Sequence, residues 1–311
     1  MNIELDRIYN MDCLEGMKRI ADGVVDCIIT SPPYFVGKEY EQDATYDEWQ
    51  SLLKAMVSTA ADKLKAGCFL VVNIADILAF KDETMPRFQA NNPDQHCDIT
   101  AEMVKTAREE HPDFSKQQLA DLLGCSNQTI DRRLNGNNAR GGKADCATRV
   151  KLVGGSLEAY AYEVGLYLYD KRIWHKDPAW ATSRWTISTL KAVSETEDIY
   201  VFWKPGEYTV NRNRLSQQEW REWGMRQVWD IPSVRANDIH PAMFPETLVR
   251  RIVRLYTDEG ALVLDPFIGS GTTAVAALME KRHFLGFETN KEYFDIAQGR
   301  IDQVLRNPTL F

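Results

Sequence analysis

The sequence lacks the segments that insertion into a membrane or export would require. Its 311 residues contain no run of about 18 consecutive apolar residues, the length of a membrane-spanning helix. Residues 1–10 also lack the basic start and apolar stretch of a secretory signal. We therefore expect a cytoplasmic protein that makes no contact with a membrane.

Cysteine and histidine are scarce. The six cysteines include no C-x-x-C pair, and only five histidines are present. This spacing supports neither a disulfide framework nor a zinc ribbon. No group of Asp, Glu and His has the spacing of metal ligands, so we predict no metal site.

Positive charge is also limited, because 37 Lys and Arg stand against 45 Asp and Glu, giving a net charge of −8. This balance argues against a protein coated with basic residues. It leaves room for a local basic face that follows a phosphate backbone. Any surface for nucleic acid must therefore be regional.

Short β-branched and apolar runs alternate with helix-like segments along most of the chain. Helix signals include 49–64 and 246–256, and strand signals occur at 24–30, 68–74, 199–203, 261–264 and 283–287. This alternation predicts an α/β fold with a mostly parallel sheet. Ligands collect beyond the carboxyl ends of such strands, so we expect the chemistry in the loops that follow them.

Residues 91–149 interrupt this alternation, because they are polar and poor in strand signals. Inside them, 116–123 predicts a helix, Gly124 a turn, Ser126 an N-cap and 127–134 a second helix, the pattern of a helix-turn-helix. Ala120 is small where the helices would cross. The residues expected to face a shared core are Leu119, Leu123, Ile130 and Leu134.

The second of these helices carries side chains that suit contact with DNA. From 115 to 151 the chain has seven Lys or Arg against three acidic residues. An ordinary helical hairpin with a solvated polar face is the alternative interpretation. The residues expected to touch base edges or phosphates are Asn127, Gln128, Thr129, Arg132 and Arg133.

A glycine-rich turn follows the predicted strand 261–264. The segment 265–272, DPFIGSGT, lets a ligand approach backbone N–H groups closely where the helix 272–281 begins. Taken alone it is ambiguous, because Gly269, Gly271 and Ala274 also satisfy the dinucleotide spacing G-x-G-x-x-A. A nicotinamide oxidoreductase is therefore one alternative.

The segment Thr30-Ser31-Pro32-Pro33-Tyr34 favours a different reaction, transfer to an exocyclic amino group. The lone pair of an aryl amine is delocalised into the ring and must be localised before the nitrogen can attack. The Ser31 hydroxyl and the Pro32 carbonyl would accept the two amino hydrogens, and the Tyr34 ring would stack on the base. The prolines, Pro32 and Pro33, stiffen the loop, so both acceptors are fixed in advance.

These two motifs together resemble those of the S-adenosylmethionine-dependent DNA amino-methyltransferases, which modify cytosine N4 or adenine N6. The catalytic motif precedes the cofactor motif, as in the β group of that family. Further similar segments are 9–16, 173–176, 199–204 and 240–245. The resemblance covers nearly the whole chain outside the insertion and implies a Rossmann-like methyltransferase fold with a catalytic-motif half (1–90) and a cofactor-binding half (151–311). Residues 91–150 are then an inserted helical module, expected to recognise DNA.

The resemblance also implies roles for individual residues. Asp12 would approach the cofactor adenine and Glu288 the ribose hydroxyls, while Phe267 and the glycines would line the remaining cofactor surface. Simpler alternatives are that Asp12 caps the helix 13–20 and that Asp265 and Thr272 cap the turn and its helix. The expected cofactor-binding set is Asp12, Asp265, Pro266, Phe267, Gly269, Gly271, Thr272 and Glu288.

Within the family, Ser before Pro-Pro-Tyr usually accompanies cytosine N4 chemistry, whereas Asp or Asn accompanies adenine N6. We therefore predict cytosine N4, with adenine N6 as the alternative. The target nucleotide must rotate out of the duplex. Lys176 is expected to contact a phosphate, and His175 to be packed or bonded to water. Other basic residues expected along the DNA are Lys171, Arg172, Arg184, Lys191, Arg212, Arg214, Arg221 and Arg226.

Only a short interval separates Lys204 from His240, where the β group usually carries its target-recognition region. We therefore expect the inserted module to supply or share sequence recognition of double-stranded DNA. A cognate restriction endonuclease is a further expected partner, and the sequence leaves monomer and homodimer open. A DNA-binding regulator without enzymatic activity is the remaining alternative.

Overall fold

The computed structural model describes residues 3–34, 45–75, 77–81, 98–135, 148–177, 194–208, 210–234 and 245–306. The chain divides into two compact units. The sheet unit comprises Met1–Phe80, Val150–Pro178 and Ser194–Phe311, and the helical unit comprises Lys81–Arg149 and Ala179–Val193.

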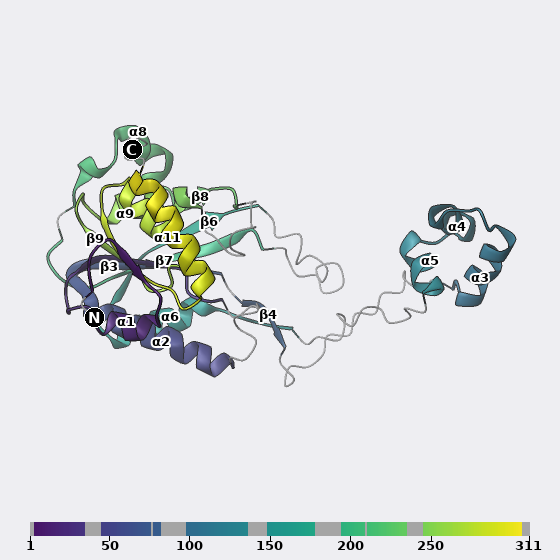
Figure 1. Cartoon of the computed structure of the whole chain (residues 1–311), viewed down its shortest axis with the longest axis horizontal. Helices are drawn as coiled ribbons and strands as arrows, with labels where there is room; N and C mark the ends of the chain where they lie inside the picture. The colour runs from purple at the N-terminus through teal and green to yellow at the C-terminus, as the bar shows by residue number, and fades with distance from the viewer. Residues whose placement is uncertain are drawn as a thin grey trace. The chain divides into compact units, whose positions relative to one another are not determined.

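An eight-stranded sheet forms the centre of the sheet unit (Figure 1). Every pairing is parallel except those of β7, which runs antiparallel to β3 and β6. The predicted α/β fold with a mostly parallel sheet is therefore confirmed. In spatial order the strands are β1 (Arg7–Tyr9), β10 (His283–Phe287), β9 (Leu262–Asp265), β2 (Val25–Thr30), β3 (Leu64–Ile74), β7 (Thr196–Trp203), β6 (Tyr167–His175) and β8 (Val228–Asp230).

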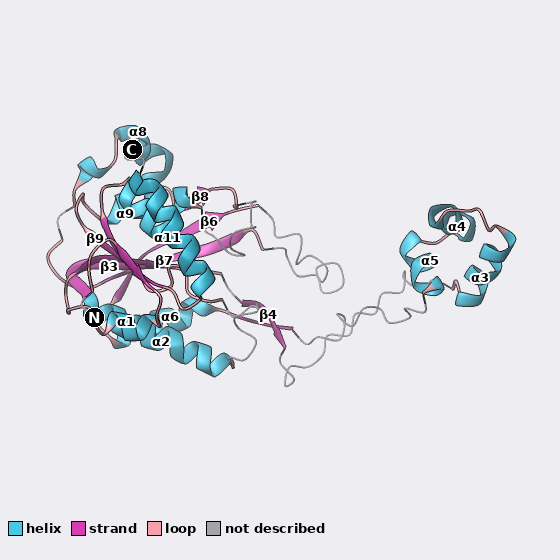
Figure 2. Ribbon diagram, in the orientation of Figure 1, coloured by secondary structure: helices cyan, strands magenta, loops and turns pink. Residues whose placement is uncertain are grey.

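Helices cover both faces of this sheet (Figure 2). Adjacent strand residues such as Ile28 and Ile29 belong to different core clusters, because side chains alternate between the faces of a strand. One cluster includes buried residues of α1 (Cys13–Met17), α2 (Tyr46–Lys63) and α6 (Val153–Glu163). The other includes buried residues of α9 (Glu246–Tyr256), α10 (Thr272–Met279) and α11 (Lys291–Arg306).

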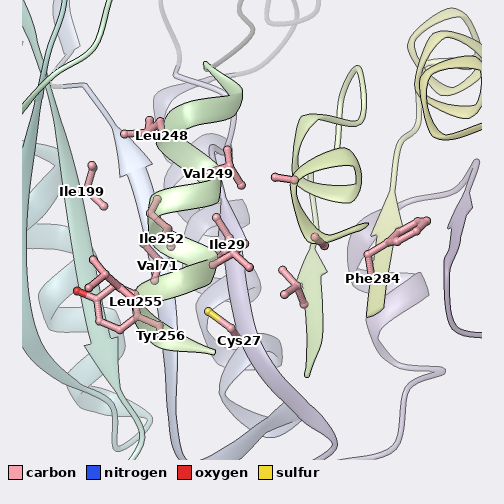
Figure 3. Packing of buried hydrophobic residues seen from close by; sticks show 14 of the residues in the cluster. Cys27, Ile29, Val71, Ile199, Leu248, Val249, Ile252, Leu255, Tyr256 and Phe284 are labelled. Atoms are coloured by element: carbon pink, nitrogen blue, oxygen red, sulfur yellow. The ribbon is translucent and has the colours of Figure 1, made fainter. Parts of the chain in front are cut away.

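Helix α9 shows how the apolar pattern sets these layers. Its residues Leu248, Val249 and Ile252 are fully buried and pack near Ile29 and Val71 of the sheet (Figure 3). Apolar residues at such spacing form one buried face of a helix. The structure confirms the predicted bounds 246–256. None of the helices in the described ranges has the length and apolarity needed to cross a membrane.

Helix α2 begins at Tyr46, earlier than the predicted residue 49. The Thr45 side chain accepts from the Glu48 backbone N–H, and the Glu48 carboxylate accepts from the Thr45 N–H. This reciprocal capping box satisfies two backbone donors and fixes the start of the helix. The capping residues, rather than the apolar pattern, therefore decide where α2 begins.

The segment after β7 completes the sheet unit with η4 (Arg212–Arg214), α8 (Gln217–Glu219), η5 (Trp220–Gly224) and β8. Trp223 and Trp229 of this segment are buried in the core, and the Trp229 indole donates to the Trp223 carbonyl at 2.8 Å. The described part of this segment, 210–234, therefore contributes to the packing of the sheet unit.

The helical unit contains α3 (Ala101–Glu110), α4 (Lys116–Leu123) and α5 (Asn127–Leu134). The predicted α4, turn and α5 are present: Gly124 has a φ of 63°, and the Ser126 side chain caps α5. Helix α3 was not predicted, and it adds Val104 and Ala107 to the small core. The expectation for Leu134 is wrong, because its side chain is 37% exposed.

A two-stranded sheet pairs β4 (Ile77–Lys81) with β5 (Thr148–Lys151).

Candidate functional site

The two motifs that carry the predicted chemistry lie at the same edge of the sheet. Strands β2 and β9 are neighbours and run parallel, with Ile28 paired to Leu264. The serine-diproline corner (31–34) follows β2, and the glycine turn (265–271) follows β9, so both leave the sheet at its carboxyl edge. Thr30 is close enough to Asp265 to influence the pKa of its carboxyl group. Residues distant in sequence are thereby brought to one place.

Two hydrogen bonds hold the serine-diproline corner. The Ser31 hydroxyl lies 2.8 Å from the Tyr34 hydroxyl. The indole N–H of Trp49, a buried residue of α2, donates to the Pro33 carbonyl at 2.6 Å. The Pro33 carbonyl is therefore occupied by the protein, which leaves the Pro32 carbonyl as the backbone acceptor assigned to the amine by the sequence.

The Tyr34 hydroxyl joins the corner to two interior strands. It lies 2.8 Å from Glu197 Oε2 of β7, and the Asn73 side-chain amide of β3 donates to it at 2.9 Å. Asn73 also donates to Glu197 Oε2 at 2.7 Å. The Lys176 ammonium forms an ion pair with Glu197 Oε1, and the two side chains are only 17% and 8% exposed. A polar network thus lies directly behind Tyr34.

This network keeps Tyr34 protonated. Burial raises the pKa of the Tyr34 hydroxyl well above its ordinary value, and the neighbouring Glu197 carboxylate acts in the same direction. The group is therefore a phenol that donates one hydrogen bond. Its ring is half-buried and packs against the core cluster that Phe267 of the glycine turn also contacts.

Sequence reasoning missed Asn73 and Glu197. Asn73 interrupts an otherwise apolar strand, Leu70 to Ile74, and Glu197 stands near the start of β7 before another apolar run. A buried polar residue in such a run needs a partner, so both carried a detectable signal. The phosphate contact expected for Lys176 stays a prediction, and in the structure its ammonium is engaged with Glu197.

The glycine turn is shaped by bonds to Asp265 and by contacts from outside the turn. Asp265 accepts from the Phe267 backbone N–H at 3.0 Å and from the Thr273 hydroxyl at 2.6 Å. Gly269 and Gly271 have φ values of 52° and 85°, in the region that favours glycine. A Cβ on Gly271 would lie 2.9 Å from the Cβ of Ala297 in α11. Both backbone conformation and packing therefore require glycine at 271.

The Asp265 carboxyl group is fully buried. Burial raises its pKa to about 6, against the lowering effect of its hydrogen bonds from Thr273 and Phe267. Pro266 is buried beside it, and the Thr272 hydroxyl accepts from Arg300 at 3.2 Å. Asp265 thus caps the turn, as the alternative interpretation expected, whereas Thr272 does not cap α10, whose N-cap is Gly271 with no side-chain cap bond.

Glu288 directly follows β10 and reaches back to the glycine turn. Its carboxylate accepts from the Gly269 N–H at 3.0 Å and from the Asn290 N–H at 2.8 Å. Burial raises the pKa of this carboxyl group. The Asn10 side chain donates to the Glu288 carbonyl at 2.8 Å, which fixes the backbone there. A carboxylate is therefore held beside the turn at the end of the neighbouring strand.

Asp12 is exposed and caps α1. Its Oδ1 accepts from the Leu14 N–H at 2.9 Å and from the Glu15 N–H at 3.0 Å. The capping alternative for Asp12 is thus present in the structure, and these bonds use only one carboxylate oxygen. Within the described ranges, no three His, Cys, Asp or Glu side chains converge as metal ligands would.

The predicted DNA-contacting residues of α5 fall into two groups. Asn127, Gln128 and Arg132 are exposed. Thr129 lies 3.0 Å from the Ser126 hydroxyl, and the half-buried Arg133 donates to the Ile99 carbonyl at 2.9 Å. The exposed group can therefore reach a ligand without disturbing the unit, whereas the second group supports its internal structure.

Several other basic residues expected along the DNA have internal partners. Arg172 donates to the carbonyls of Gly224 and Arg226, and Lys171 pairs with Asp198. The Arg214 guanidinium is largely buried and pairs with Asp258 at 2.8 Å. His175 is exposed and hydrogen-bonds Asp230 at 2.6 Å rather than being packed. Arg184, Lys191 and the segment 240–244 lie outside the described residues.

Known proteins share both the sequence and the fold. A model of the N6/N4 DNA methylase family matches residues 25–299. The Type II methyltransferase M.BglI of Bacillus subtilis is 50% identical over 96% of this chain and 86% of that protein. The Type II methyltransferase M.Cfr9I of Citrobacter freundii is 28% identical over 94% of this chain and 87% of that protein.

Two solved structures extend the likeness to the fold. A candidate DNA modification methylase of Thermus thermophilus, complexed with S-adenosyl-L-methionine, matches with a TM-score of 0.62 and 22% identity, covering 96% of this chain and 93% of that one. The cytosine-N4-specific PvuII DNA methyltransferase matches with a TM-score of 0.60 and 16% identity, covering 98% and 93%. At these identities the likeness shows a common fold.

Proposed function

The chain belongs to the N6/N4 family of DNA methylases, and on this premise we propose that it methylates N4 of a cytosine rotated out of a DNA duplex. As a member of that family it is an S-adenosylmethionine-dependent DNA methyltransferase. Membership replaces the two alternatives from the sequence, a nicotinamide oxidoreductase and a regulator without enzymatic activity. The position of Ser31, beside the glycine turn at the carboxyl edge of the sheet, carries the proposal.

The residues of the turn fit S-adenosylmethionine. Gly269 and Gly271 present backbone without side chains, and Phe267 offers a half-buried aromatic surface. Glu288 supplies a carboxylate suited to ribose hydroxyls, held beside the turn by its bond from Gly269. Asp12 has a second carboxylate oxygen for an adenine amino group, with Oδ1 engaged in the cap. When bound, the cofactor supplies an electrophilic methyl group.

The serine-diproline corner prepares the amine. The Ser31 hydroxyl and the Pro32 carbonyl accept its two hydrogens, which favours the pyramidal nitrogen whose lone pair can attack. Tyr34 presents its ring to the base while its hydroxyl is anchored by Glu197 and Asn73. The amine attacks before its proton leaves, so no strong base is required in advance.

Serine at position 31 supports cytosine N4 over adenine N6, because in the family pattern Asp or Asn at this position accompanies adenine. Mass spectrometry of nucleosides from enzymatically methylated DNA tests the choice. We expect N4-methylcytosine. N6-methyladenine as the sole product would contradict the target while leaving the reaction class intact.

The helical unit is proposed to recognise the DNA sequence. Its exposed Asn127, Gln128 and Arg132 lie on the second helix of a helix-turn-helix pattern, where base contacts usually occur. A Gly/Ser bridge replacing 91–147 leaves both β4 and β5 in place. This variant should bind S-adenosylmethionine normally but lose site preference on a randomised oligonucleotide pool. Retained preference would contradict the proposal.

Arg132→Ala gives a finer test of the same unit. We expect weaker DNA binding and a salt dependence reduced by about one counterion, as for one lost phosphate contact. Arg133→Ala is the matched variant, since Arg133 donates to Ile99 and should instead lower the stability of the unit. An unchanged salt dependence of DNA binding in Arg132→Ala would show that Arg132 does not contact a DNA phosphate.

The proposed partner is double-stranded DNA in the cytoplasm. The relatives named Type II methyltransferases also suggest a cognate restriction endonuclease that cuts the same unmethylated sequence. Digestion of methylated and unmethylated DNA with candidate endonucleases that share the determined site would test this pairing.

A further inference from the structure

The network behind Tyr34 contains more polar groups than anchoring a ring requires. The Tyr34 hydroxyl is within 2.8 Å of Ser31 Oγ and of Glu197 Oε2, and it lies 3.2 Å from the Asn73 carbonyl. A phenol has one hydrogen to donate. The direction of each hydrogen bond therefore depends on which acceptor receives that hydrogen.

Glu197 is the strongest of these acceptors. Its carboxylate carries charge, and bonds to ionised acceptors are roughly twice as strong as those between neutral groups. The Lys176 ammonium forms an ion pair with the other carboxylate oxygen. Tyr34 therefore donates to Glu197. The 2.8 Å contact between Ser31 and Tyr34 is then a hydrogen bond only if Ser31 donates.

Asn73 fixes the same arrangement from β3. Its side-chain nitrogen donates to Glu197 Oε2 at 2.7 Å and to the Tyr34 oxygen at 2.9 Å. Turning the amide over would place Oδ1 against the carboxylate, so this orientation is the favourable one. The Asn73 Oδ1 atom is buried and has no hydrogen-bond partner among the described residues. The Asn73 amide thus donates to both Glu197 and Tyr34, while its own oxygen lacks a hydrogen bond among the described residues.

We infer that Glu197, with Lys176 and Asn73, is a positioning residue that sets the direction of the hydroxyl hydrogens so that Ser31 presents lone pairs to the target amine. This inference rests on the proposed function, in which Ser31 accepts an amino hydrogen. A serine hydroxyl can donate as well as accept, and only the accepting orientation localises the amine lone pair. The chain from Lys176 through Glu197 and Tyr34 selects that orientation before the base arrives.

Glu197→Gln tests the inference with little change in shape. Lys176 attracts the amide oxygen of glutamine, which turns the amide nitrogen toward Tyr34. Tyr34 then accepts from this nitrogen and is free to donate to Ser31 or to the Asn73 carbonyl, so the Ser31 hydrogen is no longer held toward Tyr34 and away from the amine. We expect kcat on duplex DNA to fall by about 10- to 100-fold, as for loss of a preorganised group in an active site. The Kd for S-adenosylmethionine should stay within about twofold, because the glycine turn is unaffected.

A double-mutant cycle with Ser31→Ala separates this role from general support of the loop. If Glu197 acts through the Ser31 hydroxyl, Glu197→Gln should have little further effect on kcat once that hydroxyl is absent. Additive losses, or full activity of Glu197→Gln, would overturn the inference alone. Full activity of Ser31→Ala would overturn the proposed acceptor and the inference together.

Two further variants keep the test independent of folding. Should Glu197→Gln unfold because Lys176 loses its charged partner, Lys176→Met in the same chain removes the unpaired ammonium. Without the ammonium, the glutamine oxygen can face Tyr34 and Asn73 and accept from both, as Glu197 Oε2 does, so kcat should return toward the wild-type value. A kcat as low as that of Ser31→Ala would overturn the inference. Glu219→Gln is the matched control, because it breaks the ion pair with Arg254 away from the corner and should leave kcat unchanged.

Discussion

The glycine turn and the serine-diproline corner lie at one edge of the sheet but are held in different ways. The turn is held by local bonds, such as those from Phe267 and Thr273 to Asp265, together with the bond from Gly269 to Glu288. The corner depends on side chains from α2, β3 and β7, namely Trp49, Asn73 and Glu197. A mostly contiguous motif, completed by Glu288 from the neighbouring strand, therefore shapes a backbone site for a cofactor, whereas orienting a hydroxyl requires groups assembled by the whole sheet unit.

Ser31→Ala should have the largest effect, and it should lower kcat without changing cofactor affinity. Loss of a preorganised acceptor in an active site costs roughly 100- to 1,000-fold in kcat, by analogy with oxyanion-hole groups. The turn is untouched, so cofactor affinity should persist. Single-turnover transfer of labelled methyl to DNA measures the first quantity, and calorimetry with S-adenosylmethionine measures the second. Loss of both together would show that the sites are not separable.

Gly271→Ala should have the reverse effect. The φ of 85° and the 2.9 Å approach to Ala297 should cost about 3 kcal/mol of folding stability and weaken cofactor binding by about 10- to 100-fold. Methyl transfer at saturating cofactor should recover much of its rate. Gly299→Ala in α11 is the matched control, because its added Cβ meets no atom within 4 Å and should raise helix stability.

This difference also explains what could be predicted from the sequence. The glycine turn, the corner and the helix 246–256 are contiguous patterns, and each appears at its predicted place. The partners of Tyr34 could not be matched in advance, because Asn73 and Glu197 meet across 124 positions of the chain. The sequence shows that Asn73 and Glu197 are isolated polar residues in apolar strands. It does not show their partners, because their contact depends on the pairing of β3 with β7, and no local pattern specifies that pairing.

The buried carboxyl group of the turn gives a prediction for pH dependence. The pKa of Asp265 is raised from 3.8 to about 6 in the folded protein, because burial disfavours the charged form. Its contribution to stability is therefore fully present below pH 3.8 and is lost as the pH rises through about 6. The loss should be about 3 kcal/mol, from about two pKa units at 1.36 kcal/mol each.

Asp265→Asn should remove this titration while keeping an acceptor for the Phe267 N–H. Urea unfolding between pH 4 and pH 7 measures the free energy of unfolding of both proteins. In the difference between them, the contributions of titrating groups common to both, including Glu288, largely cancel. The stability of the wild type relative to the variant should fall across this interval. A flat difference would show that burial does not hold the pKa of Asp265 above its ordinary value.

Trp49→Phe should have the smallest effect. It tests whether a side chain of α2 helps to position the corner for catalysis. The Trp49 indole donates to the Pro33 carbonyl, and losing this bond should lower kcat by about fivefold, which corresponds to about 1 kcal/mol. Trp229→Phe is the matched control, because the buried Trp229 indole makes a similar bond to the Trp223 carbonyl outside the corner. Both variants should lose comparable stability in urea. If kcat falls equally in both, the loss reflects general loosening of the sheet unit; if it falls only in Trp49→Phe, an α2 side chain helps to position the loop that holds the amine.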